Sequence, residues 1–542
     1  MTTISRREWL KAAAGFGIAA TGADRLPFVG AAESTQPREG RTILLVDDHD
    51  VLYRSGTVRV LHPAVRHPKN PVILQDKPWE VAIGWTSIHR DSKTGKYQLW
   101  YQAYAGKRAG DKRLECVVCY AESEDGIKFV KPEFEFHPFK EFKKTNIVLI
   151  GNGGYGDRYC NSVLVDPKEK DASRRYKMAY YDWSVVEGRE YPGLHVAFSP
   201  DGIRWTKHDT APLFRTSYGA RGLPPPFADE DAYKKSPGKN NSVRKTWRYP
   251  LLMADAVDVF YDPVRATFAI YGKMWMDAPD GTAAWKHGMG RIESKDFLHW
   301  SKPEFLLAPD DQDAPDTEFH TSPVFFHSGR YFCLNQILNR RAKGAIDIEL
   351  MTSRDGLTWE RPFRKPYFLA RSEAGQFDSR SIFTNATPIV LDDEIRFYYG
   401  AYNQSPIGGV RAETGHRSGV GMASIPRDRF AGIRPVPKSD QVTLKKPLNN
   451  IGQVTLRPQE LIGCRRITVN ADASAGEIHV ELLTAEGYRV RGFSKDDAVP
   501  IRGDSLRHSV AWKDRDLGKL PPGRYMLRLH LENAEMFAVT FH

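Results

Sequence analysis

The chain has 542 residues, of which 41% are hydrophobic and 27% are charged, a balance that excludes wholesale disorder and a polytopic membrane protein. The net charge of +11 comes from 78 basic and 67 acidic side chains. No Lys/Arg-rich block is long enough to form a nucleic-acid-binding arm, so we expect no nucleic-acid partner. The length exceeds one ordinary core and predicts a large domain with a smaller one.

The first residues predict an export signal. The run Ser5-Arg6-Arg7-Glu8-Trp9-Leu10-Lys11 precedes a weakly apolar stretch, and small residues follow at 30–32. This order is similar to a twin-arginine signal with a cleavage point. The apolar stretch is too short and too rich in Ala and Gly to span a membrane. We therefore predict a signal and linker over residues 1–40, a periplasmic or secreted mature protein, and no membrane span.

One short motif recurs along the chain after this signal. A serine is followed by an aspartate, usually a glycine, and then an aromatic residue, and an aromatic strand begins 22 to 29 residues before each serine. Asp-Gly suits a tight hairpin turn, and the aromatic side chain anchors the returning strand. The copies are Ser123–Phe129, Ser199–Trp205, Ser294–Trp300, Ser353–Trp359 and the degenerate Ser424–Phe430.

The repeat predicts the fold class. Five units of three or four antiparallel strands, without intervening helical periodicity, indicate an all-β protein with a five-bladed β-propeller over residues 41–438. The repeat stops after about residue 440, where a stretch containing Pro and Lys marks a boundary. Period-2 alternation beyond it predicts a small C-terminal β-sandwich over residues 451–542.

Acidic residues precede the expected inner strand of every unit. Inner strands of a propeller line its axis, so residues at their heads converge on one pocket. Acids from five units aimed at one axis are hard to explain as scaffolding, because burying unpaired carboxylates is costly. The acids are Asp76 and Glu80 in unit one, Asp157 in unit two, Asp255 and Asp258 in unit three, Glu318 in unit four and Asp378 in unit five.

Such a cluster suits glycoside cleavage. One carboxylic acid protonates the leaving oxygen while a carboxylate attacks the anomeric carbon or activates water. A further acid raises the pKa of the first by like-charge repulsion. Trp79 and Tyr155 would stack on a sugar ring, and the remaining candidates, which would bind hydroxyls, a carboxylate or a sulfate, are Arg158, His320 and Arg380.

No metal or other cofactor is expected. Cys116 and Cys119 form a C-x-x-C, but they lie in a predicted strand that would point their thiols to opposite faces. A second pair that would complete a zinc site is missing from the sequence. The aspartates of the repeated motif are expected to be turn-formers rather than site residues: Asp125, Asp201, Asp296 and Asp355.

The repeated Ser-x-Asp-Gly-x-x-Trp, the Asn70-Pro71-Val72 segment and the Asp-Pro turns resemble the five-bladed β-propeller glycoside hydrolases of families 32, 43 and 68 over about residues 45–435. The tail is similar to a domain often fused to them in secreted bacterial proteins. The resemblance implies a nucleophile or base from blade one, a supporting Asp from blade two, and a Glu acid usually from blade three. Here the well-placed Glu lies in blade four, and the Trp-Met-Asn-Asp-Pro and Arg-Asp-Pro signatures of invertases are missing, which argues against fructoside hydrolysis.

The residues and the resemblance together predict an exported hydrolase of a poly- or oligosaccharide. Glu80 or Asp76 would be nucleophile or base, Asp157 and Asp255 stabilisers, and Glu318 the acid. Asp258 and Asp378 join the substrate-binding set. The excess positive charge leaves an anionic carbohydrate open as substrate, although solubility explains it equally well. Two alternatives stay open: a non-catalytic carbohydrate-binding propeller, and a phosphorylase in which Arg158 and Arg380 hold phosphate.

Overall fold

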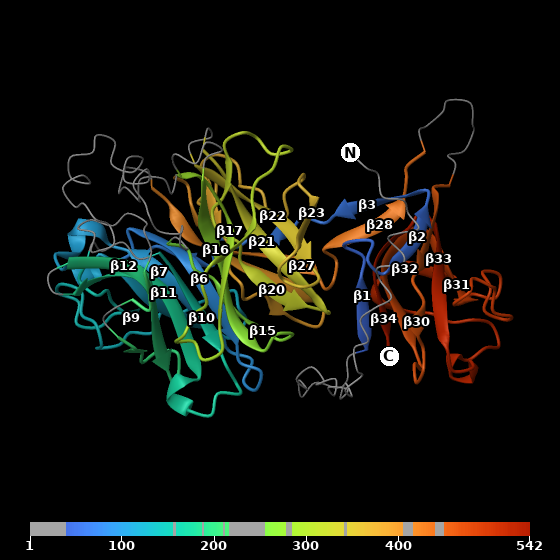
Figure 1. Cartoon of the computed structure of the whole chain (residues 1–542), viewed down its shortest axis with the longest axis horizontal. Coiled ribbons are helices and arrows are strands. Elements are labelled where there is room, and N and C mark those ends of the chain that lie inside the picture. Colours follow the sequence, from blue (N-terminus) through green and yellow to red (C-terminus); the bar gives the residue numbers. More distant parts are fainter. Residues whose placement is uncertain are drawn as a thin grey trace, which may run out of the picture. The chain divides into compact units, whose positions relative to one another are not determined.

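The structure is a computed structural model that describes residues 40–154, 159–186, 189–209, 212–215, 255–277, 284–340, 344–404, 416–438 and 449–542. Within these ranges the regular secondary structure is β-strand apart from four short 3-10 helices, so the all-β prediction is confirmed (Figure 1). The four helices are Gly106–Ala109, Lys112–Leu114, Ala172–Arg174 and Leu517–Lys519. Except for Gly40, the predicted export signal lies outside the described residues.

The first three repeat units are separate antiparallel sheets whose strands follow chain order. Unit one contains β6 (Ala82–Arg90), β7 (Tyr97–Tyr104), β8 (Cys116–Ser123) and β9 (Ile147–Leu149). Unit two contains β10 (Tyr159–Val165), β11 (Tyr176–Val186), β12 (Arg189–Ser199), β13 (Thr206–Lys207) and β14 (Phe214–Arg215). Unit three contains β15 (Val259–Asp262), β16 (Thr267–Asp277), β17 (Ala284–Ser294) and β18 (Glu304–Leu307).

The last two units share one eleven-stranded sheet, because β22 and β24 pair in parallel through Ile346 and Ser381. The number of blades therefore stays a prediction. Unit four contains β19 (Thr317–Phe319), β20 (Val324–His327), β21 (Arg330–Asn339), β22 (Ala345–Ser353) and β23 (Trp359–Phe363). Unit five contains β24 (Ser381–Phe383), β25 (Ile389–Val390), β26 (Glu394–Tyr402) and β27 (Ser418–Pro426), completed by the N-terminal strands β4 (Val65–Arg66) and β5 (Ile73–Leu74).

Polar contacts join each unit to the next and the last unit to the first. The inner strands therefore lie around a common axis. This arrangement allows side chains from units that are distant in the sequence to meet. These contacts are Val163 N to Ser87 Oγ at 2.9 Å, Val259 N to Ser162 Oγ at 2.9 Å, Thr321 Oγ1 to Asp258 Oδ2 at 3.2 Å, Gln336 Nε2 to Thr384 O at 3.3 Å, and Asn385 Nδ2 to Thr86 Oγ1 at 2.9 Å.

The repeated motif forms a turn that binds the preceding unit. Within a copy, the serine hydroxyl accepts from the glycine N–H, as Ser353 does from Gly356 at 2.9 Å. The glycine carbonyl in turn accepts from an aromatic side chain of the neighbouring unit. The pairs are Gly126 with Tyr398 at 2.7 Å, Gly202 with Trp100 at 2.6 Å, and Gly356 with Tyr271 at 2.8 Å.

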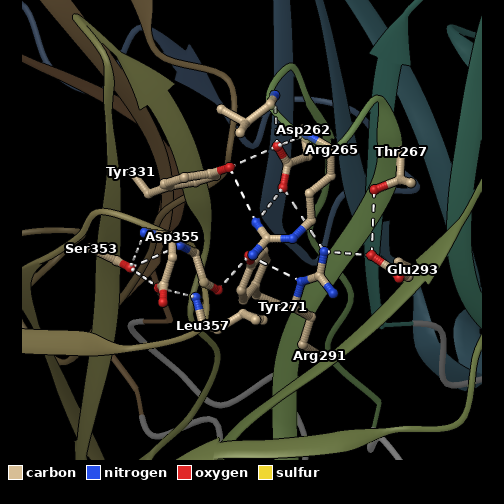
Figure 2. Close-up of polar contacts among 12 residues, drawn as sticks. Asp262, Arg265, Thr267, Tyr271, Arg291, Glu293, Tyr331, Ser353, Asp355 and Leu357 are labelled. Carbon is tan, nitrogen blue, oxygen red and sulfur yellow. Dashed lines mark hydrogen bonds and ion pairs between the residues drawn. The ribbon is translucent and has the colours of Figure 1, made fainter. Parts of the chain in front are cut away.

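Figure 2 shows this contact between units three and four. Beside the Tyr271–Gly356 bond, Tyr331 donates to Asp262 at 2.8 Å and Arg291 Nε donates to the Tyr271 hydroxyl at 3.1 Å. Asp262 has no solvent-exposed surface. The motif aspartates and Asp262 therefore stabilise turns and unit contacts, away from the inner-strand heads.

Gly202→Ala is expected to destabilise the fold more than Gly329→Ala. Both glycines have positive φ, +79° and +74°, but a Cβ at Gly202 would lie 2.6 Å from Trp100, whereas a Cβ at Gly329 would meet nothing within 4 Å. Each substitution should cost about 1 kcal/mol from backbone conformation, and the Trp100 collision adds to the first alone. Equal losses of free energy in chemical denaturation would contradict this role of the motif.

The C-terminal residues form a ten-stranded sheet with segments from elsewhere in the chain. The domain boundaries at 438 and 451 stay a prediction, yet strand pairing places residues 41–61 and 431–435 in this sheet and not in the repeat units. Its strands are β1 (Arg41–Leu44), β2 (Val51–Ser55), β3 (Thr57–Leu61), β28 (Ala431–Pro435), β29 (Ile451–Leu456), β30 (Gln459–Glu460), β31 (Ile467–Thr484), β32 (Ile501–Ser509), β33 (Arg524–Glu532) and β34 (Glu535–Phe541).

Charged pairs link this sheet to unit four. Arg330, which is 1% exposed, forms an ion pair with Asp47, and Arg354 contacts Asp47 and Asp50 at 3.1 Å each. Buried Arg–carboxylate pairs of this kind are costly to break from one side. The N-terminal segment is thus held by both the C-terminal sheet and the repeat.

Candidate functional site

The candidate site lies where the inner strands of units three and four begin. Antiparallel pairing brings the start of β15, the end of β16 and the start of β17 to one edge of unit three, and the start of β19 and the end of β21 to one edge of unit four. We call six buried residues at these edges, together with the exposed Arg340 that binds one of them, the polar cluster: Asp255, Asp258, Lys273, His287, Glu318, His320 and Arg340.

Asp255 forms a buried ion pair with Lys273. Asp255 lies just ahead of β15 and Lys273 lies within β16, and they are 2% and 4% exposed. A carboxylate and an ammonium group at this depth each depend on the other for compensation of their lost hydration. Asp255 is therefore held in a defined position at the head of the inner strand.

Glu318 is held between two donors. His287 Nδ1 lies 2.5 Å from its Oε2, and Arg340 binds both oxygens, with Nη2 3.0 Å from Oε2. Burial opposes ionisation, but the hydrogen bonds from these two residues outweigh it and lower the pKa of Glu318 to about 2. Burial lowers the pKa of His287 to about 4. At neutral pH the pair is therefore a carboxylate that accepts a hydrogen bond from a neutral imidazole, and the role of Glu318 as the acid stays a prediction.

Asp258 has the opposite protonation. It is 5% exposed and its Oδ2 accepts from Thr321 Oγ1 at 3.2 Å. Burial, partly offset by that hydrogen bond, raises its pKa from 3.8 to about 8. A carboxylic acid that stays protonated at neutral pH can donate a proton. Two carboxyl groups with pKa values displaced in opposite directions thus lie in adjacent units, linked through Thr321, which follows Glu318 closely in the chain.

Side chains of three units meet at His320. Its ring stacks on Trp85 of unit one with centroids 5.4 Å apart, and Trp85 also contacts Phe383 of unit five at 4.2 Å. Electrostatic interactions with Lys273, His287 and Glu318 all influence the pKa of His320, which places these groups in one neighbourhood. His320, predicted as a substrate-binding residue, is therefore part of the polar cluster.

Glu80 lies in a separate network within unit one. Its side chain is fully buried and accepts from Tyr101 Oη at 2.6 Å, Lys131 Nζ at 2.7 Å, and the backbone N–H groups of Asp76 and Lys77 at 3.0 and 3.1 Å. Both carboxylate oxygens are thereby used. Glu80, the predicted nucleophile, therefore forms its hydrogen bonds with residues of its own unit.

Asp76 and Trp79, which lie close to Glu80 in the sequence, also contact residues of unit one. Asp76 accepts from Lys131 at 2.6 Å. Trp79 is 1% exposed and donates from its indole N–H to Asn146 at 3.0 Å. The Trp79 ring packs on Phe139, with ring centroids 5.8 Å apart. Trp79 and Glu80 are therefore buried in the interior of unit one, whereas the Asp76 carboxylate is exposed. Within the described residues, none of the three contacts the polar cluster.

Two further predicted residues lie in unit five. Asp378 is 1% exposed and accepts from Arg66 Nε at 2.6 Å and Tyr399 Oη at 3.0 Å. Arg66 belongs to β4, so this pair fastens the N-terminal strand to the last unit. Arg380 is half-buried, and its backbone N–H donates to Tyr402. The three predicted site residues of unit two, Tyr155, Asp157 and Arg158, lie outside the described residues.

Sequence reasoning missed several members of this site. Lys273, His287 and Arg340 lie on or beside the second and third strands of their units, and Trp85 and Gln336 lie inside strands. The usable signal was charge within otherwise apolar strands, as in Tyr-Gly-Lys273-Met-Trp and Trp-Lys-His287-Gly-Met. Charged residues in a buried strand require partners, and the partners were the acids on the inner strands.

Among the described residues, no group of three or more His, Cys, Asp or Glu side chains could hold a metal ion, and no helix has the length and apolar character needed to cross a membrane. Cys119 and Cys333 are buried free thiols, and Cys116 is also buried.

No protein-family profile and no curated protein sequence matches the chain. Solved structures show distant likeness. An N-acetylgalactosamine deacetylase from F. plautii, in complex with blood group B trisaccharide, has 16% identity and a TM-score of 0.43 over 68% of this chain and 96% of its own. A thermostable family-43 glycoside hydrolase has 12% identity and a TM-score of 0.38 over 66% and 95%. A family GH32 β-fructofuranosidase from Bombyx mori has 11% identity and a TM-score of 0.38 over 88% and 95%. The similar structures thus include glycoside hydrolases of the families that the repeat resembles. At these scores the chemistry has to be argued from the residues of this chain.

Proposed function

We propose that this chain is a glycoside hydrolase whose reaction takes place at the polar cluster. The proposal is carried by two buried carboxyl groups near the inner-strand heads of adjoining units, Asp258 and Glu318, whose pKa values are displaced in opposite directions. Asp258 accepts a hydrogen bond from Thr321, which lies close to Glu318 in the chain. Glycoside cleavage needs a proton donor and a carboxylate on the same substrate. A neighbourhood that separates two carboxyl pKa values in this way supplies both at one pH.

In the proposed reaction, Asp258 donates its proton to the glycosidic oxygen as the bond from that oxygen to the anomeric carbon breaks. The negative charge of Glu318 stabilises the positive charge that develops on the sugar ring. Water adds to the anomeric carbon and gives its proton to Asp255. The acid role, expected at Glu318, is assigned here to Asp258, because Glu318 is bound by Arg340 and His287.

The finer predictions belong to the same proposal. Asp157 keeps its predicted role as a stabilising acid from unit two. Export through the signal at residues 1–40 and action on a poly- or oligosaccharide follow from the sequence, which leaves an anionic substrate open. The carbohydrate-binding and phosphorylase alternatives differ from hydrolysis in the product that they release.

Product analysis tests the proposal. The purified chain is incubated with a broad panel of neutral and anionic glycans, with and without inorganic phosphate, and products are identified by mass spectrometry. We expect a free sugar released equally in both conditions. A sugar phosphate formed only with phosphate would establish the phosphorylase alternative, and binding without any product would establish the carbohydrate-binding one.

A further inference from the structure

His320 is held by one side-chain hydrogen bond. Its Nδ1 lies 3.1 Å from Oε1 of Gln336, and its backbone N–H donates to the Gln336 carbonyl at 2.8 Å. His320 is 8% exposed and Gln336 is fully buried. The other ring nitrogen, Nε2, has no hydrogen-bond partner in the part of the chain that the structure describes.

The contacts of Gln336 determine which ring nitrogen of His320 carries the proton. The amide nitrogen of Gln336 donates to the backbone carbonyl of Thr384 at 3.3 Å, so the amide oxygen faces His320. A carbonyl oxygen can only accept, so Nδ1 of His320 must carry the hydrogen. In a neutral imidazole the second nitrogen then has a lone pair. His320 therefore presents Nε2 as an acceptor.

The surroundings of His320 keep the ring neutral. Trp85 stacks on one face, and Phe383 lies 5.8 Å away. The titratable groups that act on it are Lys273 of β16, His287 of β17 and Glu318 of β19. Burial, reinforced by the charge of Lys273, holds the pKa of His320 well below its usual range, and the Glu318 carboxylate only partly opposes this.

From this geometry we propose that His320 accepts a hydrogen bond at Nε2 from a hydroxyl group of the substrate, and that Gln336 is the positioning residue that maintains this tautomer. The inference rests on the proposed function, because it assumes a sugar in the polar cluster. It deepens that function by specifying the group recognised at His320: a neutral hydroxyl donor and not a carboxylate or sulfate. An anionic substituent would meet a lone pair at this position, which is repulsive.

The tautomer can be read without any substrate. We would label histidine with ¹⁵N and assign the His320 signals by comparison with His320→Asn. The expected result is a protonated Nδ1 and an unprotonated Nε2 from about pH 6 to about pH 8, a range that includes neutral pH. A protonated Nε2, or a doubly protonated ring in this range, would overturn the inference whether or not the chain hydrolyses glycans.

Gln336→Glu tests the positioning role. The carboxylate can still accept from Nδ1, but its charge favours the doubly protonated ring, which converts Nε2 from acceptor to donor. We expect kcat/KM on the glycan identified in the panel to fall about tenfold. The loss should be larger at about pH 6 than at about pH 8, because the ring is more readily protonated at the lower pH. Gln98→Glu is the matched control, because Gln98 is held by Tyr120 and Tyr176 outside the polar cluster.

The outcomes separate the two proposals. An unchanged kcat/KM and pH profile in Gln336→Glu, or an equal change in Gln98→Glu, would overturn the role of Gln336. If wild-type chain released no product from any glycan, the proposed function would fail, and the ¹⁵N measurement would still decide whether His320 offers an acceptor.

Discussion

Asp258→Asn is expected to reduce glycoside turnover by about 10²- to 10⁴-fold, the range for loss of a general acid. The amide preserves size and can still contact Thr321, but it has no proton to give to the leaving oxygen. The loss should appear in kcat and should be smaller for substrates whose leaving group needs no protonation, such as nitrophenyl glycosides. Turnover by wild-type chain should fall as pH rises through about 8, the pKa of Asp258.

Stability gives a second readout of the same variant. The folded pKa of Asp258 lies above the ordinary value of 3.8, so the folded chain keeps a proton that the unfolded chain releases. This contribution to stability is complete below about pH 4 and is lost as pH rises towards 8. Between about pH 4 and about pH 7 the wild type should lose about 4 kcal/mol from this group, and Asp258→Asn should lose none of it.

Chemical denaturation across pH measures the difference. Asp255→Asn is the control, because Asp255 is equally buried but forms an ion pair with Lys273. If Asp258→Asn and wild type show parallel pH dependences, Asp258 is ionised in the folded chain and is not the acid. Full turnover by a folded Asp258→Asn chain would exclude the same role.

Glu80→Gln is expected to destabilise the fold by about 3 kcal/mol, because it leaves the half-buried ammonium group of Lys131 without one of its charge partners. The carboxylate of Glu80 binds Lys131, Tyr101 and two backbone N–H groups, and it contacts no member of the polar cluster within the described residues. Turnover per folded molecule should stay near the wild-type value. Thermal unfolding and activity, measured on the same samples, separate the two effects.

A double-mutant cycle completes this test. Lys131→Met should also destabilise, since it leaves the Glu80 carboxylate buried without a cation. The double variant Glu80→Gln/Lys131→Met should lose less than the sum of the two single losses, because the two groups act as a pair. A stable Glu80→Gln chain with no turnover would instead support the original prediction that Glu80 is the nucleophile of blade one.

The sequence predicted features that depend on short-range rules. The aromatic segments and the Asp-Gly turns predicted strands throughout the repeat, and the glycine of each complete copy of the motif has the positive φ that its turn needs: Gly126, Gly202 and Gly356. These outcomes follow from the conformational preferences of neighbouring residues, which act within a few positions along the chain.

The sequence also identified residues near the inner-strand heads, but not their partners. Asp255, Asp258, Glu318 and His320 share the polar cluster, whereas Glu80 turns toward Tyr101 and Lys131 of its own unit. All of these residues lie within a few positions of an inner strand, so position along the chain could not distinguish them. Which way each carboxylate turns depends on the cations that adjacent strands bring close.

Protonation was likewise decided by tertiary structure. Glu318 and Asp258 are ordinary carboxyl groups in the sequence, and their pKa values are displaced in opposite directions because Arg340 and His287 reach one while burial isolates the other. The same holds for the N-terminal strands, which pair with residues near the far end of the chain. Local patterns determine the strands and turns. Long-range strand pairing determines which charged groups meet, and the burial of those groups determines their pKa values and therefore their chemistry.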